Sequence, residues 1–476
     1  MPVDDLHPEY KTHLADWKKC RDASAGQRAI HEAGEIYLSK LSEQEKDEYA
    51  AYLERALFYE ATGRTVEGLG GMIFRKAPVI DEKSMTEFLE DVSLDGTDIV
   101  GFAQDLTKNI LEVGRSGILV DHPTMEVNEA GEQIQLTQAQ MEVKNLRPFM
   151  KEYKAESVIF WRIGRVKNKA ALVEVRLKET IEEQDPKDEF GVIHTEQIRV
   201  LEINEADQYQ QRLFRKKAGA TNAEQAKYEP YGQPIIPVVA GAALDMIPFV
   251  FAKTDSTSPS VDEPPLMGLV NVNISHYKTT ADLEHGAHFT GLPTAVITGH
   301  TKGDEDTFRI GSTKAWVFSD PAAEARYLEF EGKGLQTLVE LLASKEDKMA
   351  SLGAQMLTPS TRKNEAEGTA EMRHMGENSV LSSISVTISE ALNKALEYAA
   401  MWMAVDPATI KLNTDFMAQT LTPQMMQALL LSWQSGGISK QTYFENMQRG
   451  EIIDSEKSFE DEQSETETTP PADEGE

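Results

Sequence analysis

The chain has 476 residues, of which 40% are hydrophobic and 27% are charged, a composition typical of a folded protein of two or more domains. Its net charge of −31 argues against broad binding to nucleic acid, which depends on basic groups that displace counterions from phosphates. The lone cysteine, Cys20, rules out an internal disulfide, and the sequence has neither a secretion signal nor the roughly 18 apolar residues of a membrane span. We expect a soluble protein folded in a reducing cytoplasm.

The N-terminal part of the chain has helical periodicity. Residues 45–74 place apolar side chains three and four residues apart, which predicts one buried stripe: Tyr49, Leu53, Ala56 and Leu57. A second helix is expected over residues 96–117, ended by Gly114 and Gly117. Its apolar face comprises Ile99, Phe102, Leu106, Ile110 and Val113.

Between about Met150 and Thr254 the period of the pattern changes to two. Segments such as "AALVEVRLKETIEE" and "TEQIRVLEI" alternate apolar and polar residues and are separated by turn-like "KNK" and "DPKDEFG". These segments predict a mostly antiparallel sheet. The Ser-, Pro- and Asp-rich linker 255–265 then marks a boundary.

The second half of the chain predicts a helix, a β-rich excursion and a returning helix. The first helix covers 266–289 and buries a stripe of Leu266, Leu269, Val270, Ile274, Tyr277 and Ala281. Short strand-like runs follow in 292–332, and the second helix covers 335–357. Its near-heptad apolar positions are Leu335, Leu338, Leu342, Met349, Leu352 and Met356.

A long polar insert then separates this helix from a third one. The insert, Thr358–Ser379, contains almost nothing apolar, although most helix connections are short. The third helix has an i+4 ladder of Val380, Ile384, Ile388, Leu392 and Leu396. A strand over Thr409–Phe416, two helices around Gly436 and Gly437, and an acidic tail with too few apolar residues to order itself complete the chain.

A search for catalytic chemistry finds no strong constellation. "GLGGMIF" at 68–74 lacks the spacing of a dinucleotide loop, and no phosphate-binding loop occurs. His285 and His288 in "EHGAH" suggest a metal only weakly, and Ser116 in "GRSG" lacks the rest of a nucleophile motif. The basic run 215–217 fits a solvated strand end better than a nucleic-acid contact. We therefore predict no enzyme activity and no cofactor or metal.

Several phrases and the order of the predicted elements resemble tailed-bacteriophage portal proteins, and within them a divergent group. The phrases are "HPEYKTHLADWKKCRDASAGQRAIHEAGEIYL", "RALFYEATGRTVEGLGGMIFRKAP" and "HYKTTADLEHGAHFTGLPTAVITG". The resemblance in order covers roughly Pro264–Ile453. It implies an α+β portal fold assembled as a ring, usually of twelve subunits, at one capsid vertex.

The resemblance also implies a role for each segment. Residues 1–263 would form the wing, 264–291 and 333–357 the two stem helices, 292–332 the clip, 358–379 the tunnel loop, 380–421 a wing helix and return strand, and 422–453 the crown. Residues 454–476 would be a disordered acidic tail. The implied partners are double-stranded DNA in the channel, capsid and scaffold proteins, the terminase large subunit and head–tail adaptor or neck proteins. The implied location is the virion, after assembly in the host cytoplasm, with no membrane contact.

The insert holds the candidate site residues, which the resemblance implies would face DNA: Arg362, Lys363, Glu365, Glu367, Glu371, Arg373 and His374. Three basic and four acidic side chains in the insert nearly cancel, which favours contact without tight capture of phosphate. A simple surface loop is the alternative. For the whole chain, the alternatives are another structural or head-completion protein of the virion and, with less support, an enzyme acting on nucleic acid.

Overall fold

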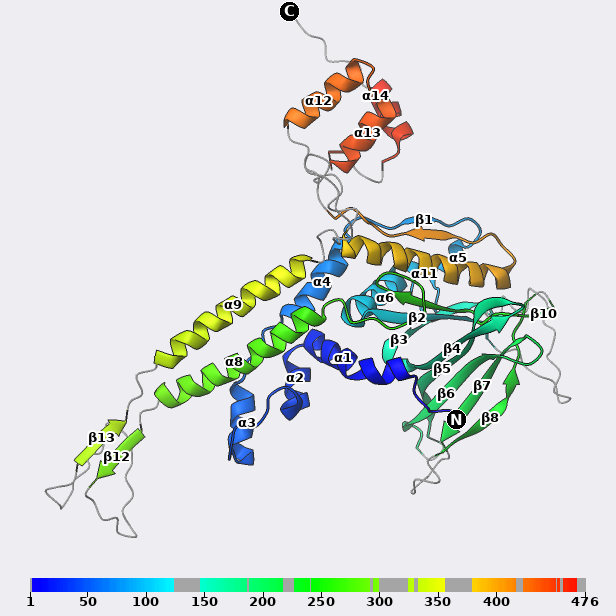
Figure 1. Cartoon of the computed structure of the whole chain (residues 1–476). Helices are drawn as coiled ribbons and strands as arrows, with labels where there is room; N and C mark the ends of the chain where they lie inside the picture. The colour runs from blue at the N-terminus through cyan, green and yellow to red at the C-terminus, as the bar shows by residue number, and fades with distance from the viewer. Residues whose placement is uncertain are drawn as a thin grey trace, which may run out of the picture.

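The computed structural model describes residues 2–123, 146–185, 188–216, 227–239, 241–291, 294–298, 324–328, 333–355, 379–416, 423–450, 452–453 and 457–468. The fold is mixed α+β, as the sequence predicts. A pair of long helices leads away from a body of helices and antiparallel sheets, and a small group of helices lies at the C-terminal end (Figure 1). In this part of the chain, no helix is long and apolar enough to cross a membrane.

Short helices dominate the N-terminal part. The elements are α1 (Pro8–Ala25), α2 (Gln27–Ala33), the 3-10 turn η1 (Gly34–Ile36), α3 (Lys46–Arg55), α4 (Ala61–Ile73), β1 (Val79–Asp81), α5 (Thr86–Glu90) and α6 (Ile99–Val113). The helix α6 begins at Asp98, whose carboxylate accepts a hydrogen bond from the Gly101 N–H at 2.8 Å. It ends at Gly114, which has a left-handed φ of 80°. Its predicted apolar face is buried throughout.

Two antiparallel sheets form the centre of the body. The three-stranded sheet has the order β11 (Phe249–Lys253), β2 (Arg115–Asp121), β3 (Phe149–Lys154). The five-stranded sheet runs in chain order through β4 (Val158–Val166), β5 (Lys169–Gln184), β6 (Val192–Ile203), β7 (Tyr209–Lys216) and β8 (Tyr228–Ile235). The turn η2 (Ala155–Ser157) connects β3 to β4, and β9 (Val238–Val239) pairs with β10 (Ala242–Ala243). The predicted sheet between Met150 and Thr254 is therefore present.

The remaining elements follow the predicted order. They are α8 (Met267–Gly291), β12 (Thr294–Thr298), β13 (Glu324–Leu328), α9 (Lys333–Gln355), α11 (Val380–Met403), β14 (Thr409–Lys411), α12 (Pro423–Gln434), α13 (Lys440–Arg449) and α14 (Phe459–Thr468). The helix α11 lies across the three-stranded sheet and next to α6, where Ile384, Ile388 and Leu392 are fully buried (Figure 1). Strands β12 and β13 pair antiparallel beyond the ends of α8 and α9.

Three sequence predictions require correction. Residues 45–74 form two helices, because the chain becomes extended at Ala56, and Leu57 is therefore 58% exposed rather than buried. Residues 115–121 form the buried strand β2, although Gly114 and Gly117 had indicated a turn there. The strand expected over Thr409–Phe416 covers only Thr409–Lys411, where it pairs with β1. Asn393 holds this short strand by bonding both the N–H and the C=O of Ile410, at 2.7 and 3.1 Å.

The acidic tail is the fourth correction, because part of it forms α14. Ser458 caps this helix by accepting a hydrogen bond from the Asp461 N–H at 3.1 Å, and the acidic residues of the first turn suit a helix N-terminus. The Phe459 ring packs edge-on against the Phe444 ring of α13, with 5.5 Å between centroids. One well-placed aromatic residue and one cap thus order a segment whose composition predicted disorder.

Candidate functional site

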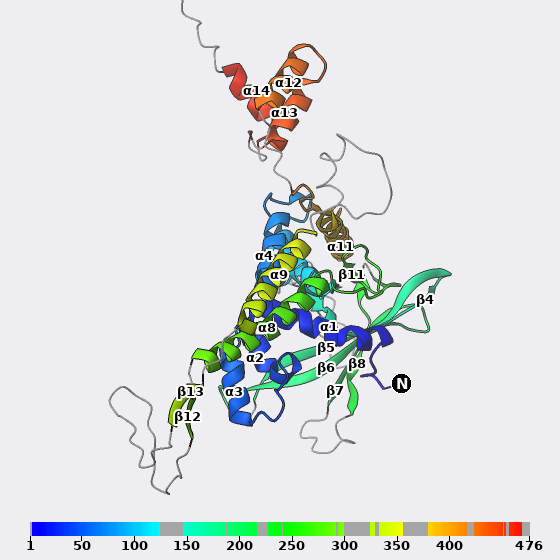
Figure 2. The same ribbon diagram turned by 60° about the vertical axis from the view of Figure 1, so that its left-hand side comes forward.

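The helices α8 and α9 form an antiparallel pair, called here the helix pair. They lie side by side in two views (Figures 1 and 2), and contacts run along their length. At the end near the body, a Cβ added to Gly268 would lie 3.7 Å from Leu352. At the end near the β12–β13 hairpin, a Cβ added to Gly286 would lie only 2.7 Å from Leu335, so α9 approaches α8 where glycine leaves room.

Polar contacts join the middle of the helix pair. The Lys345 ammonium of α9 donates to the backbone carbonyl of Ser275 at 3.0 Å and to the Thr279 hydroxyl at 2.5 Å. The imidazole of His276, which is buried, lies 3.4 Å from the Glu346 carboxylate. Burial lowers the pKa of His276, and Glu346 offsets this only in part. These contacts fix the register of α9 on α8.

The N-terminal helices brace α8 from the other side. Asn273 is fully buried in α8; its amide N–H donates to the Tyr59 carbonyl at 2.7 Å, and its carbonyl accepts from the N–H and the hydroxyl of Thr62 at 3.2 and 2.8 Å. The Tyr52 hydroxyl of α3 donates to Asp282 at 2.8 Å. All six predicted apolar residues of α8 are buried against this layer and the adjoining sheet. The N-terminal helices within residues 2–74 therefore pack onto α8 as well as onto the sheets.

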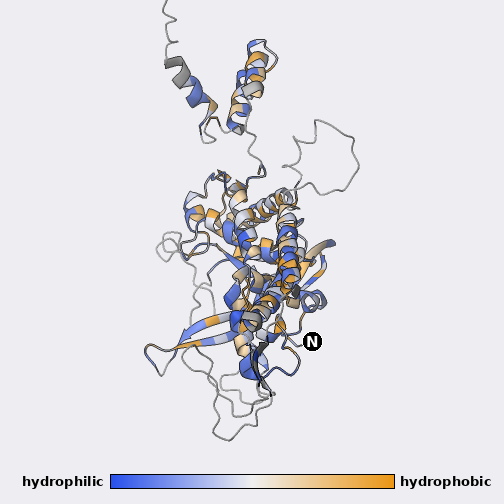
Figure 3. Cartoon of the chain, turned by 90° about the vertical axis from the view of Figure 1, so that its left-hand side faces the viewer, coloured by the Kyte–Doolittle hydropathy of each residue, from blue (hydrophilic) through white to orange (hydrophobic). Residues whose placement is uncertain are grey.

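The helix α9, in contrast, leaves most of its surface open. Of its side chains that the structure describes, Met349 alone is buried; Leu335, Leu338, Leu342 and Leu352 are half-buried, and Met356 lies outside the described residues. Val339 is 46% exposed and Leu341 is 43% exposed. On the side of the molecule where the pair lies, apolar residues are interspersed with polar ones along the helices (Figure 3). Within one chain, the predicted apolar stripe of α9 is covered only in part.

The seven residues of the insert that are predicted to face DNA lie outside the part of the chain that the structure describes. Arg362, Lys363, Glu365, Glu367, Glu371, Arg373 and His374 all fall in residues 356–378. The structure fixes the two ends of this segment: α9 is described to Gln355, and Ser379 caps α11 by accepting from the Ser382 N–H at 3.1 Å. The DNA-facing role of these residues stays a prediction.

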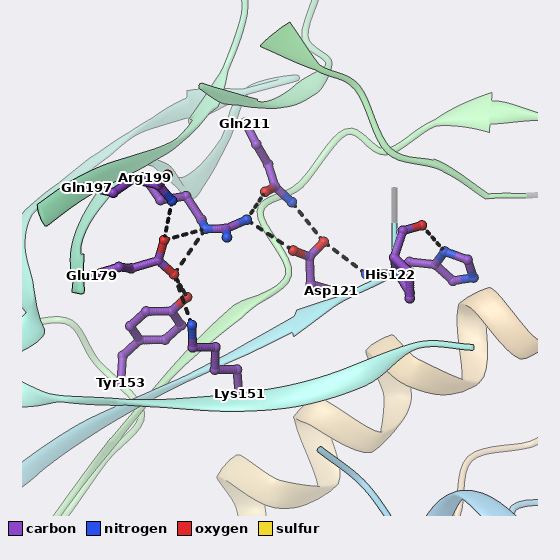
Figure 4. Close-up of polar contacts among 9 residues, drawn as sticks. Asp121, His122, Lys151, Tyr153, Glu179, Gln197, Arg199 and Gln211 are labelled. Carbon is purple, nitrogen blue, oxygen red and sulfur yellow. Dashed lines mark hydrogen bonds and ion pairs between the residues drawn. The ribbon is translucent and has the colours of Figure 1, made fainter. Parts of the chain in front are cut away.

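A buried polar network, missed by the sequence reasoning, joins the two sheets (Figure 4). Its members are Asp121 of β2, Lys151 and Tyr153 of β3, Glu179 of β5, Gln197 and Arg199 of β6 and Gln211 of β7. At its centre, Arg199 Nε lies 3.2 Å from each Glu179 carboxylate oxygen. Because alternation along a strand marks polar residues as solvent-facing, the sequence offered no signal that these residues face a second sheet.

The charges of the polar network are balanced inside it. Glu179 also accepts from the Tyr153 hydroxyl at 2.5 Å and from the Lys151 ammonium at 3.1 Å. Burial raises the pKa of Glu179, but the charges of Arg199 and Lys151 outweigh it and hold the pKa below its ordinary value. Burial raises the pKa of Asp121, and the pairing with Arg199 offsets this only in part. Since the members satisfy one another, the network is suited to holding two sheets together.

Comparison with known proteins gives three results. A family model described as a domain of unknown function (DUF4055) matches residues 265–403, which is well under half of the chain and runs from the start of α8 to the end of α11. No curated protein matches the chain. Solved structures of gene transfer agent particles are similar to it at low identity.

Three such structures each have a TM-score of 0.38. In the neck of an empty gene transfer agent particle computed with C6 symmetry, a chain has 11% identity, over 80% of this chain and 87% of that one. In the virion of a native particle the identity is 9%, over 82% and 89%. In the neck of a native particle computed with C12 symmetry it is 11%, over 87% and 96%. At this TM-score the likeness carries no argument about function.

The residues that had weakly suggested catalysis, metal binding or nucleic-acid contact are packed or paired within the fold. Ser116 is buried in β2, where its hydroxyl donates to the Glu152 carboxylate at 2.6 Å. His285 packs edge-on against the Tyr52 ring, with centroids 5.1 Å apart, and the described residues contain no group of three or more potential metal ligands. The segment 68–74 lies largely within α4. Arg215 pairs with Glu183 at 2.8 Å, and Lys216 pairs with Glu196 at 2.5 Å.

Proposed function

We propose that the chain is the subunit of a portal-type ring, which joins a phage-like head to its tail and conducts double-stranded DNA along its axis. The order of elements supports this proposal: helix, hairpin, returning helix, polar segment, third helix, short strand and C-terminal helices. The sequence phrases that resemble portal proteins lie in the N-terminal helices and in α8.

The observation that carries the proposal is the incomplete burial of α9. This 23-residue helix has one buried side chain among those that the structure describes, Met349, while Val339 and Leu341 lie outside the face that packs on α8, so it leaves more apolar surface open than a one-sided surface helix does. Neighbouring copies placed side by side would cover Val339 and Leu341. The helix is about 35 Å long at 1.5 Å per residue, and so spans roughly ten base pairs of duplex at 3.4 Å each.

The net charge fits a conduit. A channel that bound DNA tightly would oppose its passage, and a ring of twelve such chains would carry twelve times −31. Improved solubility is the simpler explanation of the same charge. The contacts with capsid, scaffold, terminase and neck proteins belong to this proposal, as do the DNA-facing role of the segment 358–379 and the absence of enzyme activity.

The test is the oligomeric state of the purified protein. Electron microscopy and native mass spectrometry should show rings with a central channel. A double variant Val339→Asp and Leu341→Asp should shift the mass to the monomer, because two buried carboxylates would oppose packing between copies. The control Gln336→Asp, at an exposed polar position of α9, should still form rings.

Folding of the double variant is checked by its circular dichroism spectrum, which should match that of the wild type because both positions are exposed in the single chain. Its melting temperature should be lower than that of the ring, because it loses the stabilisation that assembly supplies. A wild-type protein that remains monomeric at high concentration would contradict the proposal. So would unaltered rings in the double variant.

A further inference from the structure

The turn between β5 and β6 carries an unusually exposed apolar tip. Phe190 is 89% exposed, and Val192 and Ile193, which begin β6, are 55% and 42% exposed. Nearly the whole side chain of Phe190 faces solvent, which is unfavourable for an aromatic ring. Single exposed apolar residues are common, but three within four residues form a patch.

Hydrogen bonds hold the described residues of this turn, 185 and 188–191. The Asp185 N–H donates to the Gly191 carbonyl at 2.8 Å, and the Gly191 N–H donates to the Asp188 carbonyl at 3.1 Å. The Asp188 carboxylate accepts from the N–H of Phe190 itself at 3.1 Å. The Gln184 side chain donates to the Glu189 carbonyl at 2.9 Å. The backbone of Phe190 is therefore held in place before any partner binds, which lowers the entropic cost of binding.

The tip is apolar on more than one side. Successive residues of a strand point to opposite faces of the sheet, so Val192 and Ile193 flank the hairpin on its two faces while Phe190 lies at its end. Such a shape suits insertion into a pocket or groove better than contact with a flat surface.

Acidic residues surround the tip. Residues 182–190 contain five acidic side chains and one lysine. Glu183 pairs with Arg215 at 2.8 Å, and the exposed Glu182 lies 3.7 Å from His194. The carboxylates of Asp188 and Glu189 form no ion pair with any side chain in the described ranges. A partner that covers Phe190 must place groups next to these carboxylates, and basic groups would be favoured.

We propose that residues 188–193 form a docking knob: Phe190 enters an apolar pocket rimmed by lysine or arginine side chains on a different structural protein of the same particle. This inference rests on the proposed function. A second copy of this chain fits less well, because the chain carries a net charge of −31. The basic hairpin around Lys167, between β4 and β5, is already neutralised in part by Asp245 at 2.6 Å.

The test places a photoreactive phenylalanine analogue at position 190 or at the control position 36, where Ile36 is 66% exposed. Particles carrying each variant are purified and irradiated, and crosslinked proteins are identified by mass spectrometry. We expect a crosslink from position 190, and none from position 36, to a different particle protein. With that protein purified, Phe190→Ser should weaken binding at least tenfold, as for an aromatic anchor, while Ile36→Ser leaves binding unchanged.

Binding of the wild type should also weaken several-fold between 50 and 500 mM NaCl, since the acidic residues act through charge. If the particles contain the chain and position 190 gives no crosslink, or crosslinks only to a second copy, the inference is wrong and the proposed function stands. Equal binding by Phe190→Ser also overturns it. If the particles lack the chain, the proposed function fails, and this inference fails with it.

Discussion

Glu179 shows how a buried charge can stabilise this protein. Its side chain is 3% exposed and accepts hydrogen bonds from Arg199, Lys151, Tyr153 and Gln197. Because its pKa lies below the ordinary value of 4.5, the stabilisation is fully present above pH 4.5. It is lost as the pH falls through the lower pKa of the folded state.

Glu179→Gln should lower the free energy of unfolding by about 3 kcal/mol at pH 7, because Arg199 would be left in the interior without its main counter-charge. The difference in melting temperature between wild type and variant should be largest at pH 7 and shrink toward pH 3. Calorimetry across this range measures it. Asp121, whose raised pKa acts in the opposite sense, shares Arg199 with Glu179, so the variant also changes its contribution.

The control for this experiment is Glu182→Gln, on the same strand but with a side chain that is 72% exposed. This change should leave the melting temperature nearly unaltered at every pH. A Glu179→Gln protein as stable as the wild type at pH 7 would show that the polar network contributes little.

Among the elements, α14 depends on very few contacts. Its Phe459 ring packs on Phe444, which is 6% exposed, and the Gln448 side chain donates to the Lys457 carbonyl at 2.8 Å. The rest of the helix is mainly acidic and polar. The packing of Phe459 on Phe444 is therefore the aromatic contact that keeps α14 ordered, and without it we expect the helix to fray.

Phe459→Ala should open α14 without disturbing the rest of the fold. A loss of about 2 kcal/mol corresponds to roughly 30-fold more of the open form. Cleavage of the folded protein by a glutamate-specific protease at Glu460 and Glu462 should accelerate by a similar factor, followed by mass spectrometry. Ser464→Ala, at an exposed position of the same helix, should keep the wild-type rate, and an unchanged rate in Phe459→Ala would argue against this account.

The sequence predicted elements with one apolar face better than elements buried on both faces. The predicted buried faces of α6 and α8 are confirmed, because a 3.6-residue period identifies the one side of a helix that is covered. In β2 every residue is buried, including Arg115 and Asp121, so no alternation exists to reveal a strand. In α9 the pattern located the apolar residues, but it could not show that one chain covers them only in part. The polar network depends on pairing between distant strands, which a single sequence does not encode locally.

At the scale of the whole molecule, acidic charge and the polar insert act together in the proposed conduit. The insert contributes three basic and four acidic side chains to a chain that is acidic elsewhere. A segment of this composition would touch DNA without holding it. The insert follows α9 and precedes α11 in the chain, so a deletion within it shortens the connection between these two helices.

Deletion of Glu365–Met375 should leave ring assembly intact, because the contacts that the structure describes for α8, α9 and α11 involve residues outside the deleted range. Packaging or retention of DNA should be impaired. Electron microscopy checks the rings, and quantitative measurement of DNA per particle checks the genome content. A deletion protein that yields particles with the wild-type amount of DNA would remove this role from the insert.

The bracing of α8 by residues far earlier in the chain also fixes an order of events during synthesis. Helices α1, α3 and α4 leave the ribosome about 200 residues before Asn273, so the surface that receives α8 already exists when α8 emerges. The helix α9 follows with almost no buried side chains of its own. In the proposed ring, α8 would already be packed on the N-terminal helices when copies meet, and the exposed apolar side chains of α9 would be covered only at that step.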